Sequence, residues 1–192
     1  MGLFDTPDFR KSFVEKHKNH KVIDLGCGPS KFPGSIGVDF IKSPCVDIVH
    51  NLNQYPYPIE PGIDAVFMNH VIEHVEDIPR TIREVHRLLA PGGELWIATP
   101  HFTDSSSYID PTHKYHLGLR SFMQFCAPRS DMFVMELAYV VLKGRWKNLG
   151  YEKYINTRPS KNEISRRARI WEDRYSFTRR GAEMFFILKK TG

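Results

Sequence analysis

The segment from Val22 to Pro29, with the sequence Val-Ile-Asp-Leu-Gly-Cys-Gly-Pro, constrains the fold of this 192-residue chain more than any other feature. A short apolar run leads directly into two glycines, and a second short run, Ile36-Gly37-Val38, ends in Asp39. A glycine pair after a strand lets the backbone pass close to a ligand, and an acid at the tip of the next strand can accept hydrogen bonds from both hydroxyls of a ribose. The pattern predicts a nucleoside site.

The spacing between the two strands limits which nucleoside fits. A dinucleotide fingerprint, G-x-G-x-x-G, needs a third glycine where this chain has Lys31, and a full helix aimed at a pyrophosphate. About ten residues separate the strands, and Pro29 and Pro33 lie among them, so at most one helical turn fits. The segment therefore favours a nucleoside without phosphates, with a strand-turn-strand of a generic α/β domain as the alternative.

Composition sets the class of protein. A chain of 192 residues with 41% hydrophobic content suits one α/β domain. No apolar run approaches the roughly 20 residues that span a bilayer, and no signal peptide opens the chain, so we expect a cytoplasmic protein. Cys27, Cys45 and Cys126 are far apart, which argues against a disulfide framework and a zinc knuckle. The net charge of +5 is compatible with a nucleic-acid partner but too mild to require one.

The order of the apolar runs in the first half predicts a mostly parallel sheet. After Asp39, further strands are expected over residues 46–52, 64–70 and 94–99. Between the last two, apolar residues recur at spacings of four, three and four, which marks one face of a helix. These residues are Ile78, Ile82, Val85 and Leu89, and Pro91-Gly92-Gly93 follows them as a helix stop.

The second half is less regular. Residues 101–118 are rich in Ser, Asp and His, so we expect them outside the core, next to the ligand-facing end of a strand. Further elements are expected as a short helix over 120–127, an apolar segment over 133–142 and a final strand over 184–188. A basic amphipathic helix from Glu163 to Tyr175 should dock on the core, and its core-facing residues are Ile164, Ala168, Trp171 and Tyr175.

Four motifs in a fixed order resemble class I S-adenosylmethionine-dependent methyltransferases. They are Asp24 to Asp39, Asp64 to His70 followed by Val71-Ile72-Glu73-His74, Arg87-Leu88-Leu89-Ala90-Pro91-Gly92-Gly93, and Thr99-Pro100, so the resemblance covers roughly residues 20 to 102. It implies a Rossmann-like α/β fold, a mostly parallel seven-stranded sheet with helices on both faces and an antiparallel last strand. In this chain the first crossover is shortened.

The resemblance also implies where S-adenosylmethionine, and its product S-adenosylhomocysteine, would bind. The expected cofactor-binding residues are Asp24 in the first motif; Gly26, Cys27, Gly28, Asn69 and His70 around the methionine part; Asp39 at the ribose; and Asn51 and Leu52 at the adenine. The short crossover leaves little room for the usual helix contacts to the methionine carboxylate. Lys31 either replaces those contacts as a cation or is a solvated lysine.

Methyl transfer to a hydroxyl needs the acceptor oxygen held close to the methyl carbon, water excluded and a proton removed. Imidazole is the natural base near neutral pH. We expect the base to be, in order of preference, His113, His101 or His74, with loop orientation by hydrogen bonding as the alternative for each. Asp110, His113 and His116 could form a three-ligand metal set, but we expect no metal.

Beyond residue 102 the similarity is to a narrower group. Tyr108-Ile109-Asp110-Pro111-Thr112-His113-Lys114, Ser121-Phe122 and Trp171-Glu172 resemble compact methyltransferases of polysaccharide and surface-glycan biosynthesis. This resemblance implies a sugar-containing or other polar acceptor.

The sequence therefore predicts a methyltransferase that acts on a small or glycan-linked polar acceptor, with a hydroxyl as the expected target. We expect a single domain over residues 1–192, with an N-terminal helix in 1–20, a cofactor-binding core in 21–100, an acceptor-side lid in 101–130, and the end of the sheet with the basic helix in 131–192. The alternatives are an RNA or protein methyltransferase that uses the basic helix, and a non-catalytic cofactor-binding partner subunit.

Overall fold

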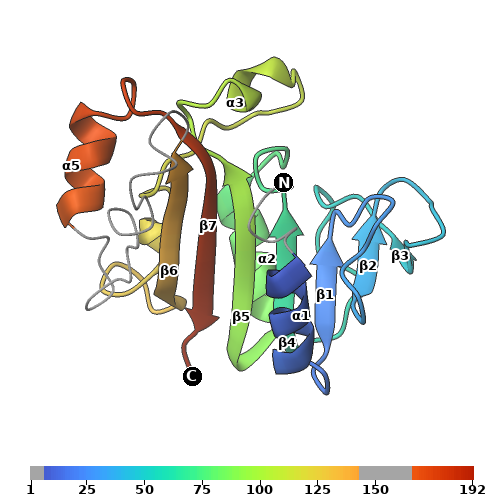
Figure 1. Cartoon of the computed structure of the whole chain (residues 1–192). Coiled ribbons are helices and arrows are strands. Elements are labelled where there is room, and N and C mark those ends of the chain that lie inside the picture. Colours follow the sequence, from blue (N-terminus) through green and yellow to red (C-terminus); the bar gives the residue numbers. More distant parts are fainter. Residues whose placement is uncertain (1–6, 143–165) are drawn as a thin grey trace.

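The structure of the protein is a computed structural model that describes residues 7–142 and 166–192. Its centre is a seven-stranded sheet with the order β3-β2-β1-β4-β5-β7-β6 (Figure 1). The strands are β1 (Val22–Leu25), β2 (Ile36–Asp39), β3 (Ile48–Val49), β4 (Ile63–Asn69), β5 (Leu89–Pro100), β6 (Phe133–Leu142) and β7 (Gly181–Lys190). The helices are α1 (Pro7–Lys16), α2 (Ile78–Leu88), α3 (Ser106–Ile109), the 3-10 helix η2 (Met123–Phe125) and α5 (Arg166–Arg174).

The last strand of the described chain runs against its neighbours. Strand β1 pairs in parallel with β2 and β4, β2 with β3, and β4 with β5. Strand β7 pairs antiparallel with both β5 and β6. These pairings confirm the predicted Rossmann-like sheet, which is mostly parallel with an antiparallel last strand.

Helices cover both faces of the sheet. Successive side chains of a strand point to opposite faces, so alternate residues of a buried strand pack against different helices. In β4, Ala65 and Phe67 pack in one buried cluster with Phe13 of α1, whereas Val66 and Met68 belong to the other cluster, which includes the apolar face of α2. Figure 1 shows α1 and α2 on opposite sides of the sheet. A continuous apolar run such as β4 is what a strand covered on both faces requires.

The first crossover is short, as predicted, and the stretch from residue 26 to residue 35 contains no helix. Instead of a helix, the buried Asp24 carboxylate closes this stretch by accepting a hydrogen bond from Phe32 N at 2.7 Å. The Phe32 ring fills the space beside the sheet and contacts Phe13 of α1, with ring centroids 4.6 Å apart. The β1–β2 connection therefore packs through one aromatic side chain.

Two expectations for the second half need correction. Instead of the helix expected over 120–127, the chain has one turn of 3-10 helix, η2, over residues 123–125, which ends because Cys126 adopts an extended conformation. Residues 101–118 are not excluded from the core, since Asp104 and Ser107 are buried polar residues. Polar composition alone gave the wrong prediction for this segment.

The basic helix docks on the core through part of the predicted face. Ala168 and Trp171 of α5 are buried, as expected, and belong to the same apolar cluster as α2. Tyr175 is 49% exposed because it follows the end of α5, where the chain turns away from helical geometry. Residues 163–165, and with them Ile164, lie outside the described residues. None of the described helices is long and apolar enough to cross a membrane.

Candidate functional site

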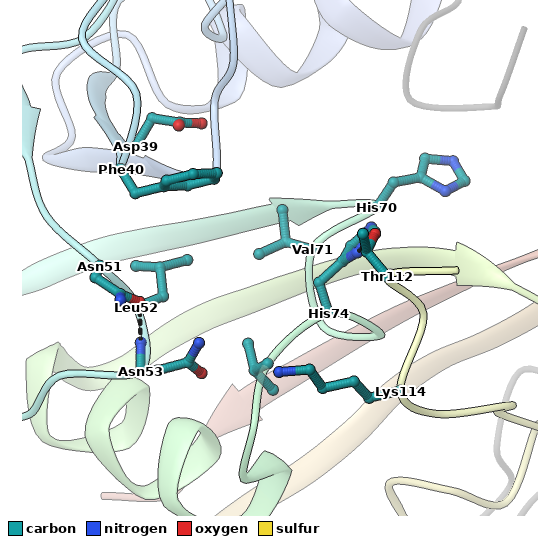
Figure 2. A pocket seen from close by; sticks show the side chains of 12 residues that line it. Asp39, Phe40, Asn51, Leu52, Asn53, His70, Val71, His74, Thr112 and Lys114 are labelled. Carbon is teal, nitrogen blue, oxygen red and sulfur yellow. Dashed lines mark hydrogen bonds between the residues drawn. The ribbon is translucent and has the colours of Figure 1, made fainter. Parts of the chain in front are cut away.

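A cavity of about 610 Å³ lies where β1, β2 and β4 end. Its walls come from the residues that follow these strands and from the polar segment 101–118. The lining residues are Gly26, Asp39, Phe40, Asn51, Leu52, Asn53, His70, Val71, His74, Val75, Thr112 and Lys114. Figure 2 shows Asp39, Phe40 and Asn51 on one side, and His70, His74 and Thr112 on the other. We call these sides the Asp39 end and the His74 end.

Asp39 is fixed at the tip of β2 by backbone groups. Its Oδ2 accepts a hydrogen bond from Gly28 N at 2.9 Å, and its Oδ1 accepts one from Ile41 N at 2.9 Å. Each carboxylate oxygen has capacity for a further hydrogen bond. The side chain therefore presents two neighbouring acceptors to the cavity, an arrangement that matches the paired hydroxyls of a ribose.

Gly26 forms part of the cavity wall with its backbone alone. Its φ of +69° lies in the left-handed region, and a Cβ at this position would be 2.4 Å from Val71 Cγ2, which also lines the cavity. Only glycine combines this conformation with this close approach. The first glycine of the sequence motif is therefore required by the shape of the cavity.

Four of the predicted cofactor residues do not line the cavity, although they build its surroundings. Asp24 closes the β1–β2 connection, and Gly28 donates to Asp39. The Cys27 thiol is buried, and this burial raises its pKa to about 11, so the sulfur stays a neutral packing group. Asn69 ends β4, and its buried Oδ1 accepts no hydrogen bond from the described residues.

Several lining residues were not predicted from the sequence. Phe40 is 71% exposed, and its place directly after Asp39 is the sequence signal that points to it. The others are Asn53, Val71, Val75, Thr112 and Lys114. Lys31, considered as a cation for the methionine carboxylate, instead forms an ion pair with Asp47 at 2.5 Å and does not line the cavity.

His70 carries a charge at the mouth of the cavity. It has a φ of +55°, a conformation that residues with a side chain rarely adopt and that tends to occur at functional sites. Its Nε2 lies 2.8 Å from Glu183 Oε1, and its Nδ1 lies 3.4 Å from Glu73 Oε1. Partial burial opposes the charge, but the hydrogen bond to Glu183 and the nearby negative charge of Glu73 outweigh it and raise the His70 pKa to about 10.

Two of the three candidate bases meet at the His74 end. His74 lines the cavity, and its Nδ1 lies 2.9 Å from Thr112 Oγ1. His113 packs against it with ring centroids 4.6 Å apart. The Asp110, His113 and His116 set does not form one metal-binding group, since His116 turns to Ser107 and stacks on Tyr108. The three side chains that do converge are Glu73, His74 and His113.

His101, the second candidate base, is in the interior rather than at the cavity. It has 0% exposure, and its ring nitrogens contact Thr103 Oγ1 at 2.7 Å and Glu172 Oε1 at 3.4 Å. The ring also packs on Trp171 of α5, with centroids 5.1 Å apart. Because no acceptor can reach a ring enclosed in this way, His101 joins α5 to the end of β5.

The comparisons with known proteins decide the family. A family model for a methyltransferase domain matches residues 7–168. The chain belongs to this methyltransferase family. The methyltransferase is 37% identical over 114 residues to a protein from Mycolicibacterium smegmatis named as a probable S-adenosylmethionine-dependent methyltransferase, covering 50% of this chain and 44% of the relative. It is 31% identical over 81 residues to the 2-phytyl-1,4-naphtoquinone methyltransferase of Nostoc punctiforme, covering 36% and 35%.

The methyltransferase spans less than half the length of these two curated relatives. Among solved structures, an S-adenosylmethionine-dependent methyltransferase from Mesorhizobium loti has a TM-score of 0.59 with this chain, at 15% identity, and covers 98% of this chain and 100% of its own. At that identity the similarity shows the fold alone. The family makes S-adenosylmethionine the cofactor of the domain, and the bare backbone at Gly26 and the paired acceptors of Asp39 fit such a nucleoside.

Proposed function

We propose that the domain transfers a methyl group from S-adenosylmethionine to an oxygen, expected to be a hydroxyl, of a small or glycan-linked polar acceptor. The observation that carries this proposal is a single cavity with two chemically different ends. The Asp39 end offers hydrogen-bond acceptors, an exposed aromatic ring and an amide, the groups that suit a nucleoside. The His74 end offers imidazole, hydroxyl and ammonium groups, which suit a polar acceptor.

The groups that line the Asp39 end support our proposal that the cofactor binds there. Asp39 accepts hydrogen bonds from the ribose hydroxyls, Asn51 and Leu52 contact the adenine, and Phe40 covers it as an aromatic surface. The backbone at Gly26 and the side chain of His70 face the methionine part. Asp24, Cys27, Gly28 and Asn69 support these groups from behind the cavity wall.

We propose that the acceptor binds at the His74 end. Bound S-adenosylmethionine supplies an electrophilic methyl group. The chain itself must hold the acceptor oxygen, exclude water and remove the hydroxyl proton. Thr112 and Lys114 offer polar contacts, His74 lines this end of the cavity, and His113 packs against His74 from behind. In this proposal residues 101–130 serve as the acceptor-side lid.

The cofactor half of the proposal is tested by calorimetry. Wild-type protein should bind S-adenosylhomocysteine in the micromolar range, roughly −8 kcal/mol. Asp39→Ala should weaken binding by roughly 1.5 to 3 kcal/mol because the ribose hydroxyls lose a charged acceptor. The exposed Asp131 gives a matched control, and Asp131→Ala should leave the affinity unchanged. Binding heat with NAD, but with neither S-adenosylmethionine nor S-adenosylhomocysteine, would overturn the assignment of the cofactor.

The acceptor half is tested with a labelled methyl donor and a panel of hydroxylated metabolites, oligosaccharides, RNA and protein. Label in a metabolite or oligosaccharide supports the proposal. Label in RNA, with binding that weakens steeply as salt rises, would favour a nucleic-acid acceptor bound by basic residues such as those of α5. Cofactor binding without label in any acceptor would favour a non-catalytic partner subunit.

A further inference from the structure

Three side chains of metal-binding type converge behind the His74 end of the cavity. Glu73 and His74 follow β4, and His113 comes from the polar segment 101–118. One ligand atom from each lies within 4.8 Å of the others. His74 also lines the cavity, as Figure 2 shows, so the group borders the space assigned to the acceptor.

Glu73 has an unsatisfied oxygen in this group. Its side chain is 1% exposed, and Oε2 accepts a hydrogen bond from Thr99 Oγ1 at 3.0 Å. Oε1 accepts none from the described residues; His70 Nδ1 lies 3.4 Å away and His113 Nε2 lies 4.0 Å away. This oxygen forms an ion pair with His70 but lacks a hydrogen bond, and a buried polar atom without a hydrogen bond is costly.

The hydrogen bond of His113 leaves the lone pair on its Nε2 free. Its Nδ1 lies 3.2 Å from the backbone oxygen of Ser107, and a carbonyl oxygen can only accept. Nδ1 therefore carries the proton, and the neutral ring has its lone pair on Nε2, the nitrogen 4.0 Å from Glu73 Oε1. A backbone carbonyl that fixes the tautomer in this way is a common support for a metal-binding histidine.

The hydrogen bonds of His74 also determine which of its ring nitrogens carries the proton. Thr112 has one hydroxyl proton, which it donates to Asp110 Oδ1 at 2.6 Å. Thr112 Oγ1 must therefore accept from His74 Nδ1, 2.9 Å away. The neutral ring of His74 then has its lone pair on Nε2. Asp110 and Thr112 together hold the ring in a state that can bind a cation.

We propose that Glu73, His74 and His113 bind a divalent transition-metal ion. Two imidazoles and one carboxylate are a donor set for ions such as Zn²⁺, Fe²⁺, Co²⁺ or Mn²⁺, and three protein ligands leave coordination positions open. The ion would lie next to the cavity, because its ligand His74 lines it. When Glu73 turns to the ion, His70 keeps its second carboxylate, Glu183, at 2.8 Å.

The role of the ion rests on the proposed function. An ion with open positions at the His74 end would bind an oxygen of the acceptor and make its hydroxyl easier to ionise. The two imidazoles would then act by holding the ion, and the proton of the acceptor hydroxyl would be released to solvent water. This role favours acceptors that have two neighbouring oxygens, because such a group could chelate the ion.

Metal binding can be tested without turnover. Tag-free protein, freed of metal by dialysis against a chelator, is titrated with Co²⁺ while its visible absorption is followed, and with Zn²⁺ by calorimetry. We expect one ion per chain with a dissociation constant of about 10 μM or tighter. Glu73→Gln and His113→Ala should each weaken binding at least tenfold. His116→Ala, a histidine of the same segment outside the group, should change it less than threefold.

The outcomes separate this inference from the proposed function. No binding of either ion by wild-type protein at about 1 mM, roughly −4 kcal/mol, would overturn the metal site. Equal affinity in wild type, Glu73→Gln and His113→Ala would also overturn it. S-adenosylhomocysteine is titrated into the metal-free protein in parallel, with thermal unfolding of each variant as a check of folding. Loss of cofactor binding with intact metal binding would count against the proposed function alone.

Discussion

The two ends of the cavity are built in different ways. The Asp39 end comes from segments close together in sequence and is held mainly by backbone hydrogen bonds. Gly26 N donates to Val38 O at 2.7 Å, and Gly28 N donates to the Asp39 carboxylate at 2.9 Å. Glycine conformation and strand ends determine these bonds, so the local sequence is enough to specify them.

The His74 end depends on side chains from distant segments. Thr112 reaches His74 across 38 positions of the sequence, and His70 reaches Glu183 across 113. Glu172 of α5 accepts a hydrogen bond from Leu119 N at 2.6 Å and so holds the chain just after the polar segment. Such a network forms only when the whole domain is folded. The comparison suggests that cofactor binding and acceptor chemistry can be separated by mutation.

The largest effect is expected at the His74 end. His113→Ala should lower turnover by roughly 10² to 10⁴, because it removes the imidazole that packs on His74 at the proposed acceptor end, and should leave cofactor affinity within a factor of a few. Turnover with an identified acceptor and calorimetry with S-adenosylhomocysteine measure the two quantities. Equal losses in both would show that the two ends are not separate, and unchanged turnover would exclude a role for this ring.

The next largest effect concerns the support of the His74 end by α5. Trp171 is buried, its Nε1 donates to Arg179 O at 3.0 Å, and its ring packs on His101. Trp171→Ala should lower the free energy of unfolding by roughly 3 to 5 kcal/mol. Tyr175→Ala, at the half-exposed end of the same segment, should cost about 1 kcal/mol or less. Denaturant unfolding gives both values, and similar losses would contradict the assigned packing.

A smaller effect is expected at the Asp39 end. Gly26→Ala combines a left-handed backbone, which costs roughly 1 to 2 kcal/mol, with an overlap against Val71, so it should weaken cofactor binding about tenfold. Gly28→Ala carries a similar backbone cost at φ +55°, but its Cβ would meet nothing within 4 Å. Calorimetry should therefore show a smaller loss for Gly28→Ala. A larger loss for Gly28→Ala would place the cofactor against the second glycine.

The smallest effect is expected in the pH dependence of stability through Glu172. Burial opposes ionisation of this carboxyl, but hydrogen bonds from His101, Leu119 N and Arg120 outweigh burial and hold its pKa below the ordinary value. Because the folded pKa is lowered, its contribution to stability is present above the unfolded pKa of about 4.3 and is lost as the pH falls below that. Denaturant unfolding between about pH 6 and pH 3 should show a steeper loss for wild type than for Glu172→Gln, which cannot titrate. The same pH dependence of stability in wild type and Glu172→Gln would contradict this role of Glu172.

Much of the fold followed from the sequence because it depends on periodicity and backbone conformation. The apolar run of β4 is typical of a strand covered on both faces, and the two prolines after β1 limited the crossover to at most one helical turn, of which the structure has none. The short helix expected over 120–127 is one 3-10 turn over residues 123–125, because Cys126 is extended and Phe122, Met123 and Phe125 pack into the core.

The sequence by itself determined the main features of the Asp39 end. They are a strand, a glycine in the left-handed conformation that glycine adopts most readily, and an acid at the tip of the next strand. Those features are local, and each residue type has one physical reason to be there. Only the tertiary structure decided which histidines are near the cavity. It enclosed His101 in the core and brought His113 to Glu73 and His74. Side chains from distant segments converge through packing of the whole domain, which no spacing within a single segment encodes.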